Sequence, residues 1–141
     1  MASTLHHRRS ANEKNIEELQ DDTSRWEDLF QINTEEIRFL QKFLSSDIFE
    51  GNLPNLYEKL QDFFTEVEEL KTEKMELHEQ LRNHKNDLNG MMECEDISCE
   101  TFYYTQHQNL TDKIERHLEK VQDLKMKIIR FSTPLLKKNN N

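Results

Sequence analysis

The stretch LPNLYEKLQDFFTEVEELKTEKMELHEQLRNHKNDL, residues 53–88, decides the fold, because its apolar residues recur at steps of four and three. Ten positions follow this spacing without a break: Leu56, Leu60, Phe63, Val67, Leu70, Lys74, Leu77, Leu81, His84 and Leu88. Such a repeat averages 3.5 residues, so it keeps one stripe of a long helix facing a partner and favours a left-handed supercoil. We therefore expect the rest of the chain to pack against this helix.

Two further stretches carry the same spacing, one on each side of the first. The stripe before it consists of Ile16, Leu19, Thr23, Trp26, Phe30, Asn33, Ile37, Leu40 and Leu44. The stripe after it consists of Tyr103, His107, Leu110, Ile114, His117, Val121, Leu124, Ile128 and Phe131. Asp96 or Ser98 is a suitable N-cap for this last helix, and Pro134 marks its end.

The sequence predicts one all-α domain over residues 10–134. The expected segments are a disordered N-terminal tail at 1–9, helices at about 10–46, 53–89 and 97–133, and a short C-terminal tail at 135–141 that frays past Leu136. Similar lengths and short links predict an elongated up-down-up antiparallel three-helix bundle with coiled-coil packing. In outline this resembles a spectrin-type repeat, a likeness of architecture that implies no shared function. The alternative is an extended chain that dimerises through the same stripes.

Local signals place the ends of the first two helices. Ser10 or Asn12 is expected to cap the first helix, with a glutamate three residues after Ser10 completing a capping box. Pro54 suits the first turn of the second helix, where its missing N–H costs nothing. Gly51 and Gly90 are expected in the two turns, because both fall where the apolar spacing stops.

Composition excludes several functions. The 141 residues carry 28 acidic and 19 basic side chains, a formal charge of −9, which disfavours binding to nucleic acid or to anionic membranes. No apolar run approaches the length of a transmembrane helix, and no secretory signal follows Arg8 and Arg9. We therefore expect a cytoplasmic protein that does not span a membrane.

The motifs of common enzymes and cofactor sites are also missing. Two isolated glycines cannot form a phosphate-binding loop. No catalytic Ser-His-Asp triad or Cys-His pair can be recognised in the sequence. None of the six histidines follows a glutamate at the spacing that bundle metal sites use. The sequence predicts no enzyme, no cofactor and no metal site.

Five polar residues occupy stripe positions: Asn33, Lys74, His84, His107 and His117. We expect them to set helix register at some cost in stability rather than to perform chemistry. Aligning the helix ends gives the expected neighbours: Asn33 with Val67, Trp26 with Lys74, His84 with Thr101, and His117 with Val67 or Leu70. Lys74 is then expected either to extend to solvent or to lie over Trp26.

Cys94 and Cys99 have a spacing that matches neither a redox pair nor a standard zinc pair. Two reduced thiols are the expected state in a cytoplasmic protein. The alternatives are a loop disulfide, or a zinc site in which the two thiols combine with His84 and the His6–His7 tail.

Aromatic residues concentrate near the first connection, so that end is expected to be the more stable. This predicts a larger loss of stability for Phe63→Ala than for Leu19→Ala.

The best function class is a non-enzymatic coiled-coil interaction or scaffold protein that binds a helical partner or itself. Apolar residues beside the stripes are the candidate partner-binding surface: Leu29, Ile32, Phe39, Phe43, Tyr57 and Phe64. Alternatively, the third helix covers them with Ile129, Phe131, Leu135 and Leu136. The second function class is a small regulator that responds to a ligand or metal at the Cys94/Cys99 end.

Overall fold

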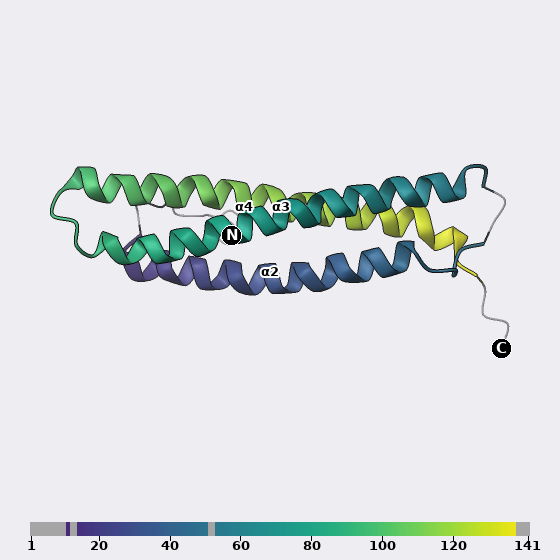
Figure 1. The fold of residues 1–141 in the computed structure, drawn as a ribbon, viewed down its shortest axis with the longest axis horizontal. Coiled ribbons are helices and arrows are strands. Elements are labelled where there is room, and N and C mark those ends of the chain that lie inside the picture. Colours follow the sequence, from purple (N-terminus) through teal and green to yellow (C-terminus); the bar gives the residue numbers. More distant parts are fainter. Residues whose placement is uncertain (1–10, 12–13, 51–52, 138–141) are drawn as a thin grey trace, which may run out of the picture. The chain divides into compact units, whose positions relative to one another are not determined.

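The described part of the chain forms three α-helices packed against one another (Figure 1). The computed structural model describes residues 11, 14–50 and 53–137. The helices are α2 (Ile16–Leu44), α3 (Leu56–Met91) and α4 (Ile97–Ser132), and a 3₁₀ turn, η2 (Thr133–Leu135), follows α4. Within these ranges no strand occurs, so the all-α prediction is confirmed.

Helix α2 begins at Ile16, later than the predicted residue 10. Asn15 Oδ1 accepts a hydrogen bond from the Glu18 N–H at 2.9 Å, and Glu18 Oε1 accepts one from the Asn15 N–H at 3.3 Å. This is a capping box, and it fixes the start because both N-terminal donors are satisfied there. The predicted caps Ser10 and Asn12 lie outside the described residues.

The start of α3 also differs from the prediction. Asn55 has a φ of 64°, which is not helical, so Pro54 lies before the helix and not in its first turn. The start of α4 is as predicted: Asp96 Oδ1 accepts a hydrogen bond from the Cys99 N–H at 2.8 Å.

Gly90 lies inside the last turn of α3, so the prediction that it closes the helix in a turn is wrong. A Cβ atom at this position would lie 2.7 Å from the Tyr103 hydroxyl oxygen on α4. The Tyr103 side chain approaches the Gly90 backbone closely, and any other residue here would require the tip of that side chain to shift. The other glycine, Gly51, lies outside the described residues.

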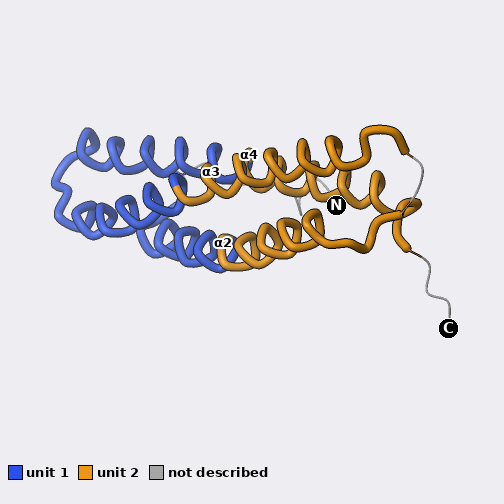
Figure 2. The backbone as a smooth tube through the Cα atoms, turned by 45° about the vertical axis from the view of Figure 1, so that its right-hand side comes forward, with its two compact units in different colours: residues 1–29, 76–115 blue, residues 30–75, 116–141 orange. Residues whose placement is uncertain are grey.

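The chain divides into two compact units, each built from segments of all three helices (Figure 2). Unit 1 comprises Met1–Leu29 and Glu76–Glu115, and unit 2 comprises Phe30–Met75 and Arg116–Asn141. The apolar core of unit 1 includes Ala11, Leu19, Leu88 and Met91. That of unit 2 consists of Ile37, Leu40, Leu44, Leu56, Leu60, Val67, Leu124 and Ile128. Nearly all of these core residues belong to the predicted stripes.

The aromatic residues near the first connection are less buried than expected. Phe39 and Tyr57 are exposed, Phe63 and Phe64 are only partly buried, and Leu19 is fully enclosed. Phe63 and Phe64 pack against the core of unit 2, so the predicted aromatic cluster is present here, but its rings are less buried than expected.

Residues 135–137 are paired with the connection between α2 and α3. The Glu50 N–H donates to the Leu135 carbonyl at 2.6 Å, and the Lys137 N–H donates to the Ile48 carbonyl at 2.8 Å. These bonds flank an isolated antiparallel bridge between Phe49 and Leu136. The prediction of a tail that frays past Leu136 is therefore wrong at Lys137.

The observed burial reverses the expected order of two core substitutions. Leu19→Ala should lower the free energy of unfolding by about 2 to 5 kcal/mol, because it leaves a cavity in a closed core. Phe63→Ala should cost less, since solvent already reaches its ring. Urea unfolding followed by circular dichroism measures both, and a larger loss for Phe63→Ala would contradict this account.

Candidate functional site

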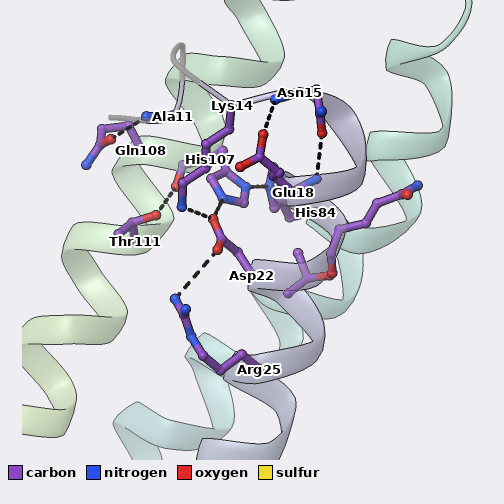
Figure 3. A network of polar contacts seen from close by, with 12 residues as sticks. Ala11, Lys14, Asn15, Glu18, Asp22, Arg25, His84, His107, Gln108 and Thr111 are labelled. Carbon is purple, nitrogen blue, oxygen red and sulfur yellow. Dashed lines mark hydrogen bonds and ion pairs between the residues drawn. The ribbon is translucent and has the colours of Figure 1, made fainter. Parts of the chain in front are cut away.

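A chain of polar side chains crosses the interior of unit 1 (Figure 3). His84 comes from α3, His107 from α4 and Asp22 from α2, and all three are buried. His84 Nε2 lies 2.7 Å from His107 Nδ1, and His107 Nε2 lies 2.9 Å from Asp22 Oδ2. The Lys14 ammonium donates to the same carboxylate oxygen at 2.7 Å, and Arg25 lies 3.6 Å from the other oxygen. We call these groups the unit 1 network.

The charge of Asp22 determines which ring nitrogen atoms of His107 and His84 carry a proton. An ionised Asp22 only accepts, so His107 carries its proton on Nε2 and accepts with Nδ1. His84 must then donate from Nε2, which leaves its Nδ1 as an acceptor. That Nδ1 is buried without a hydrogen-bond partner, and so is the Oε1 atom of Gln106. Two acceptors cannot bond each other, so the end of the network at His84 is unsatisfied.

Burial keeps the two histidines neutral. Burial, together with the neighbouring His107, lowers the pKa of His84 from 6.5 to about 4, against smaller opposing effects of Asp87 and Gln106. Burial also lowers the pKa of His107 despite its bond to Asp22. For Asp22, burial alone would raise the pKa, but hydrogen bonds from Lys14 and His107 outweigh it and the net shift is downward.

Ring contacts and a backbone hydrogen bond hold the unit 1 network in place. The His107 ring packs between two others, with centroids 4.9 Å from Trp26 and 4.9 Å from His84. The Tyr104 hydroxyl donates to the Lys14 carbonyl at 3.0 Å, which ties the segment before α2 to α4.

A second network crosses unit 2. Buried His117 on α4 contacts Asn33 Nδ2 through Nε2 at 2.7 Å and Glu73 Oε1 through Nδ1 at 2.7 Å. Glu73 also accepts from the Lys120 ammonium at 2.8 Å. His117 therefore carries its proton on Nδ1 and accepts from the Asn33 amide, while Asn33 Oδ1 has no hydrogen-bond partner.

The same balance of burial and charge governs the pKa values in the unit 2 network. Burial lowers the pKa of His117 despite the nearby carboxylate. For Glu73, burial would raise the pKa, but hydrogen bonds from Lys120 and His117 give a net lowering.

These contacts correct the predicted register. His84 meets His107 and not Thr101, six residues earlier on α4. Lys74 donates to Thr34 Oγ1 at 2.7 Å, so its level on α2 is eight residues beyond Trp26. On α3, His117 contacts Glu73 and not Val67 or Leu70. Asn33, which was expected beside Val67, is bonded to His117 on α4. The residues predicted to set register are thus brought together, but at levels other than those expected.

The structure joins Cys94 and Cys99 in a disulfide, with their Cα atoms 5.5 Å apart, so the expectation of two reduced thiols is wrong. Bridged sulfur atoms are not thiolate ligands, and His84 Nε2 is bonded to His107. The structure therefore does not assemble Cys94, Cys99 and His84 as metal ligands. His6 and His7 lie outside the described residues, and those that are described include no group of three possible ligands.

The six predicted partner-binding residues fall into two groups. Ile32, Phe39 and Tyr57 are exposed, to 59%, 62% and 82%, whereas Leu29, Phe43 and Phe64 are partly buried. Phe43 and Phe64 pack against the core of unit 2. Phe39 stacks on Phe43 with ring centroids 5.7 Å apart. The exposed apolar surface of unit 2 thus includes a face of α2, which we define as Ile32, Phe39 and Phe43.

Sequence reasoning missed the two carboxylates, Asp22 and Glu73. A usable signal was present for Asp22, which lies three residues after Leu19 and four before Trp26, on the buried side of the helix. Glu73 is adjacent to a stripe position and carried no comparable signal.

The fold and networks define the class of the protein as an all-α helical bundle with buried polar pairs. Comparison with protein-family models, with curated proteins and with solved structures finds no significant match.

The buried histidines should make stability depend on pH. Between pH 6.5 and about 4 the unfolded chain binds a proton at His84 that the folded chain does not, so stability falls as pH falls through this range. At pH 5.0 the loss from His84 should be about 2 kcal/mol relative to pH 7.5, because one pKa unit corresponds to about 1.4 kcal/mol. The lowered pKa values of Asp22 and Glu73 keep both carboxylates charged at pH 5.0.

Urea unfolding at the two pH values tests this. His84→Gln should be less stable at pH 7.5 yet lose less stability on acidification. A His84→Gln protein with the full wild-type loss would show that His84 is not the group responsible.

Proposed function

We propose that this chain is a non-enzymatic interaction or scaffold protein that binds other helices through the exposed face of α2. The observation that carries the proposal is the exposure of Ile32 and Phe39, at 59% and 62%. These residues lie seven apart, on one side of the helix, and Phe43 continues the side. Large apolar side chains gathered on one surface are typical of a protein interface.

A non-enzymatic role is supported by how the titratable groups are used. Four buried or partly buried titratable side chains each have two hydrogen-bonding partners among other side chains: His107, His117, Asp22 and Glu73. Residues so engaged hold helices together, which matches the role of polar residues in coiled-coil stripes.

For the architecture we propose an up-down-up bundle with heptad packing. Its support is the order of the paired residues within each unit. As the residue number rises along one helix, the number of its partner on the other helix falls, as it does for antiparallel helices. In unit 1 the α3–α4 pairs are Gln80 with Lys113, His84 with His107, and Asp87 with Gln106. In unit 2 the α2–α3 pairs are Thr34 with Lys74 and Gln41 with Glu68. A partner helix would extend this kind of packing.

We propose a cytoplasmic location and a protein partner. The charge of −9 argues against nucleic acid as that partner. No helix in the described ranges is both long and apolar enough to cross a bilayer. The Cys94–Cys99 disulfide weighs against the cytoplasm, because disulfides persist mainly in oxidising compartments.

The second candidate, a ligand- or metal-responsive regulator at the Cys94/Cys99 end, has less support. Its metal form requires two thiolates, whereas the two sulfur atoms are bridged.

Labelled amphipathic helical peptides test the proposed function. With Ile32→Glu and Phe39→Glu together, peptide affinity should fall by about tenfold or more, because two buried apolar contacts are lost. The matched control is Phe102→Glu, since Phe102 is as exposed as Phe39, at 62%, but lies on α4. Fluorescence anisotropy gives the affinities, and circular dichroism confirms that the variants fold. Peptide binding that is insensitive to both α2 substitutions would contradict the proposal.

A further inference from the structure

The exposed face of α2 belongs to a second stripe with helical spacing, apart from the buried one. Ile32, Glu36, Phe39 and Phe43 follow one another at steps of four, three and four. This is the spacing of a coiled-coil seam, and in unit 2 it is not covered by another helix at Ile32 or Phe39. Phe43 is also in edge contact with Phe49, with centroids 5.2 Å apart, so the apolar surface continues toward the first connection.

The charge within this stripe is already compensated. Glu36 is the one charged residue in it, and it forms an ion pair with Lys125 of α4. The Glu36 carboxylate is therefore held toward its own molecule, and a partner approaching Phe39 need not neutralise it.

On the solvent side of the stripe, two charged residues of opposite sign can pair between copies, although one of them, Glu35, also forms an exposed ion pair with Arg38 of its own helix at 2.8 Å. Glu35 and Lys42 lie seven residues apart on this flank, with Phe39 near the midpoint between them. A two-fold axis near Phe39 would place Glu35 of each copy opposite Lys42 of the other. Two-fold interfaces pair residues in this reciprocal way. In a parallel, in-register pair, Glu35 would instead face Glu35 of the other copy, and Lys42 would face Lys42.

We propose that the partner of the α2 face is a second copy of this chain, paired antiparallel along α2 with Phe39 near the two-fold axis. This inference rests on the proposed function and adds to it the partner and its orientation. Ile32 of each copy packs near Phe43 of the other, and Phe39 packs near Glu36 of the other, beside the Glu36–Lys125 pair.

The exposed area sets the strength of this dimer. Ile32 and Phe39 together offer on the order of 200 Å² per copy, since a buried aromatic side chain covers about 150 to 250 Å² in full. A stable dimer needs about 800 Å² from each partner. The α2 pair is therefore weak and depends on concentration, with a dissociation constant expected between about 1 μM and 1 mM.

Sedimentation equilibrium of the full chain over this concentration range tests the proposal. The wild type should dimerise, and so should Phe102→Glu, whereas Phe39→Glu should remain monomeric with its helices intact. Glu35→Lys and Lys42→Glu should each weaken the dimer by about fivefold, because each converts two attractive pairs into repulsive ones. The double variant, Glu35→Lys with Lys42→Glu, should restore wild-type affinity, because the pairs re-form with the charges exchanged.

Three results would overturn the proposal. A wild type that is monomeric throughout would exclude the second copy, and continued binding of amphipathic peptides would then leave the proposed function standing. A dimer that Phe39→Glu does not disrupt would place the interface elsewhere. A dimer that the charge exchange fails to restore would exclude the antiparallel register.

Discussion

The structure depends on what a buried neutral imidazole requires. Such a ring has one donor and one acceptor, and each needs a partner because desolvation of an unpaired polar atom costs about 1 to 3 kcal/mol. His84, His107 and His117 are all buried. Each of them meets a polar group on another helix, although His84 does so through Nε2 alone. This requirement selects which residues of α2, α3 and α4 lie side by side within each unit.

The same requirement explains how far the sequence could predict the fold. The stripes were predictable because burial follows apolar periodicity, and Leu19, Phe30, Ile114 and Ile128 are indeed enclosed. The register was not, because sliding one helix past another by seven residues presents the same apolar stripe again. Aligning helix ends put His84 six residues from its true level at His107. Only the matching of polar groups across helices distinguishes such alternatives.

The candidate sites were predictable in kind but not in detail. The polar stripe residues are buried and contact other helices, apart from partly buried Lys74. Sequence reasoning missed their carboxylate partners, of which Asp22 carried a signal of burial and Glu73 did not. Exposure of apolar residues next to a stripe depends on the rotation of each helix about its axis. That rotation is set by side-chain packing, which left Ile32 and Phe39 exposed but placed Phe43 against the core. The disulfide was only an alternative at the sequence level, because cysteine spacing alone does not determine pairing.

The most direct test of the register claim is NMR on the double variant His84→Leu with His107→Leu. Replacing the two histidines with apolar residues of similar size should keep the helices folded at lower stability, because buried Asp22 loses the hydrogen bond from His107 and keeps that from Lys14. The account predicts that the α3–α4 contacts are then no longer unique. Amide spectra should show more than one set of resonances, and the contact between residues 80 and 113 should weaken. A single set of resonances with the wild-type contacts retained would contradict the claim that the histidine pair fixes the register.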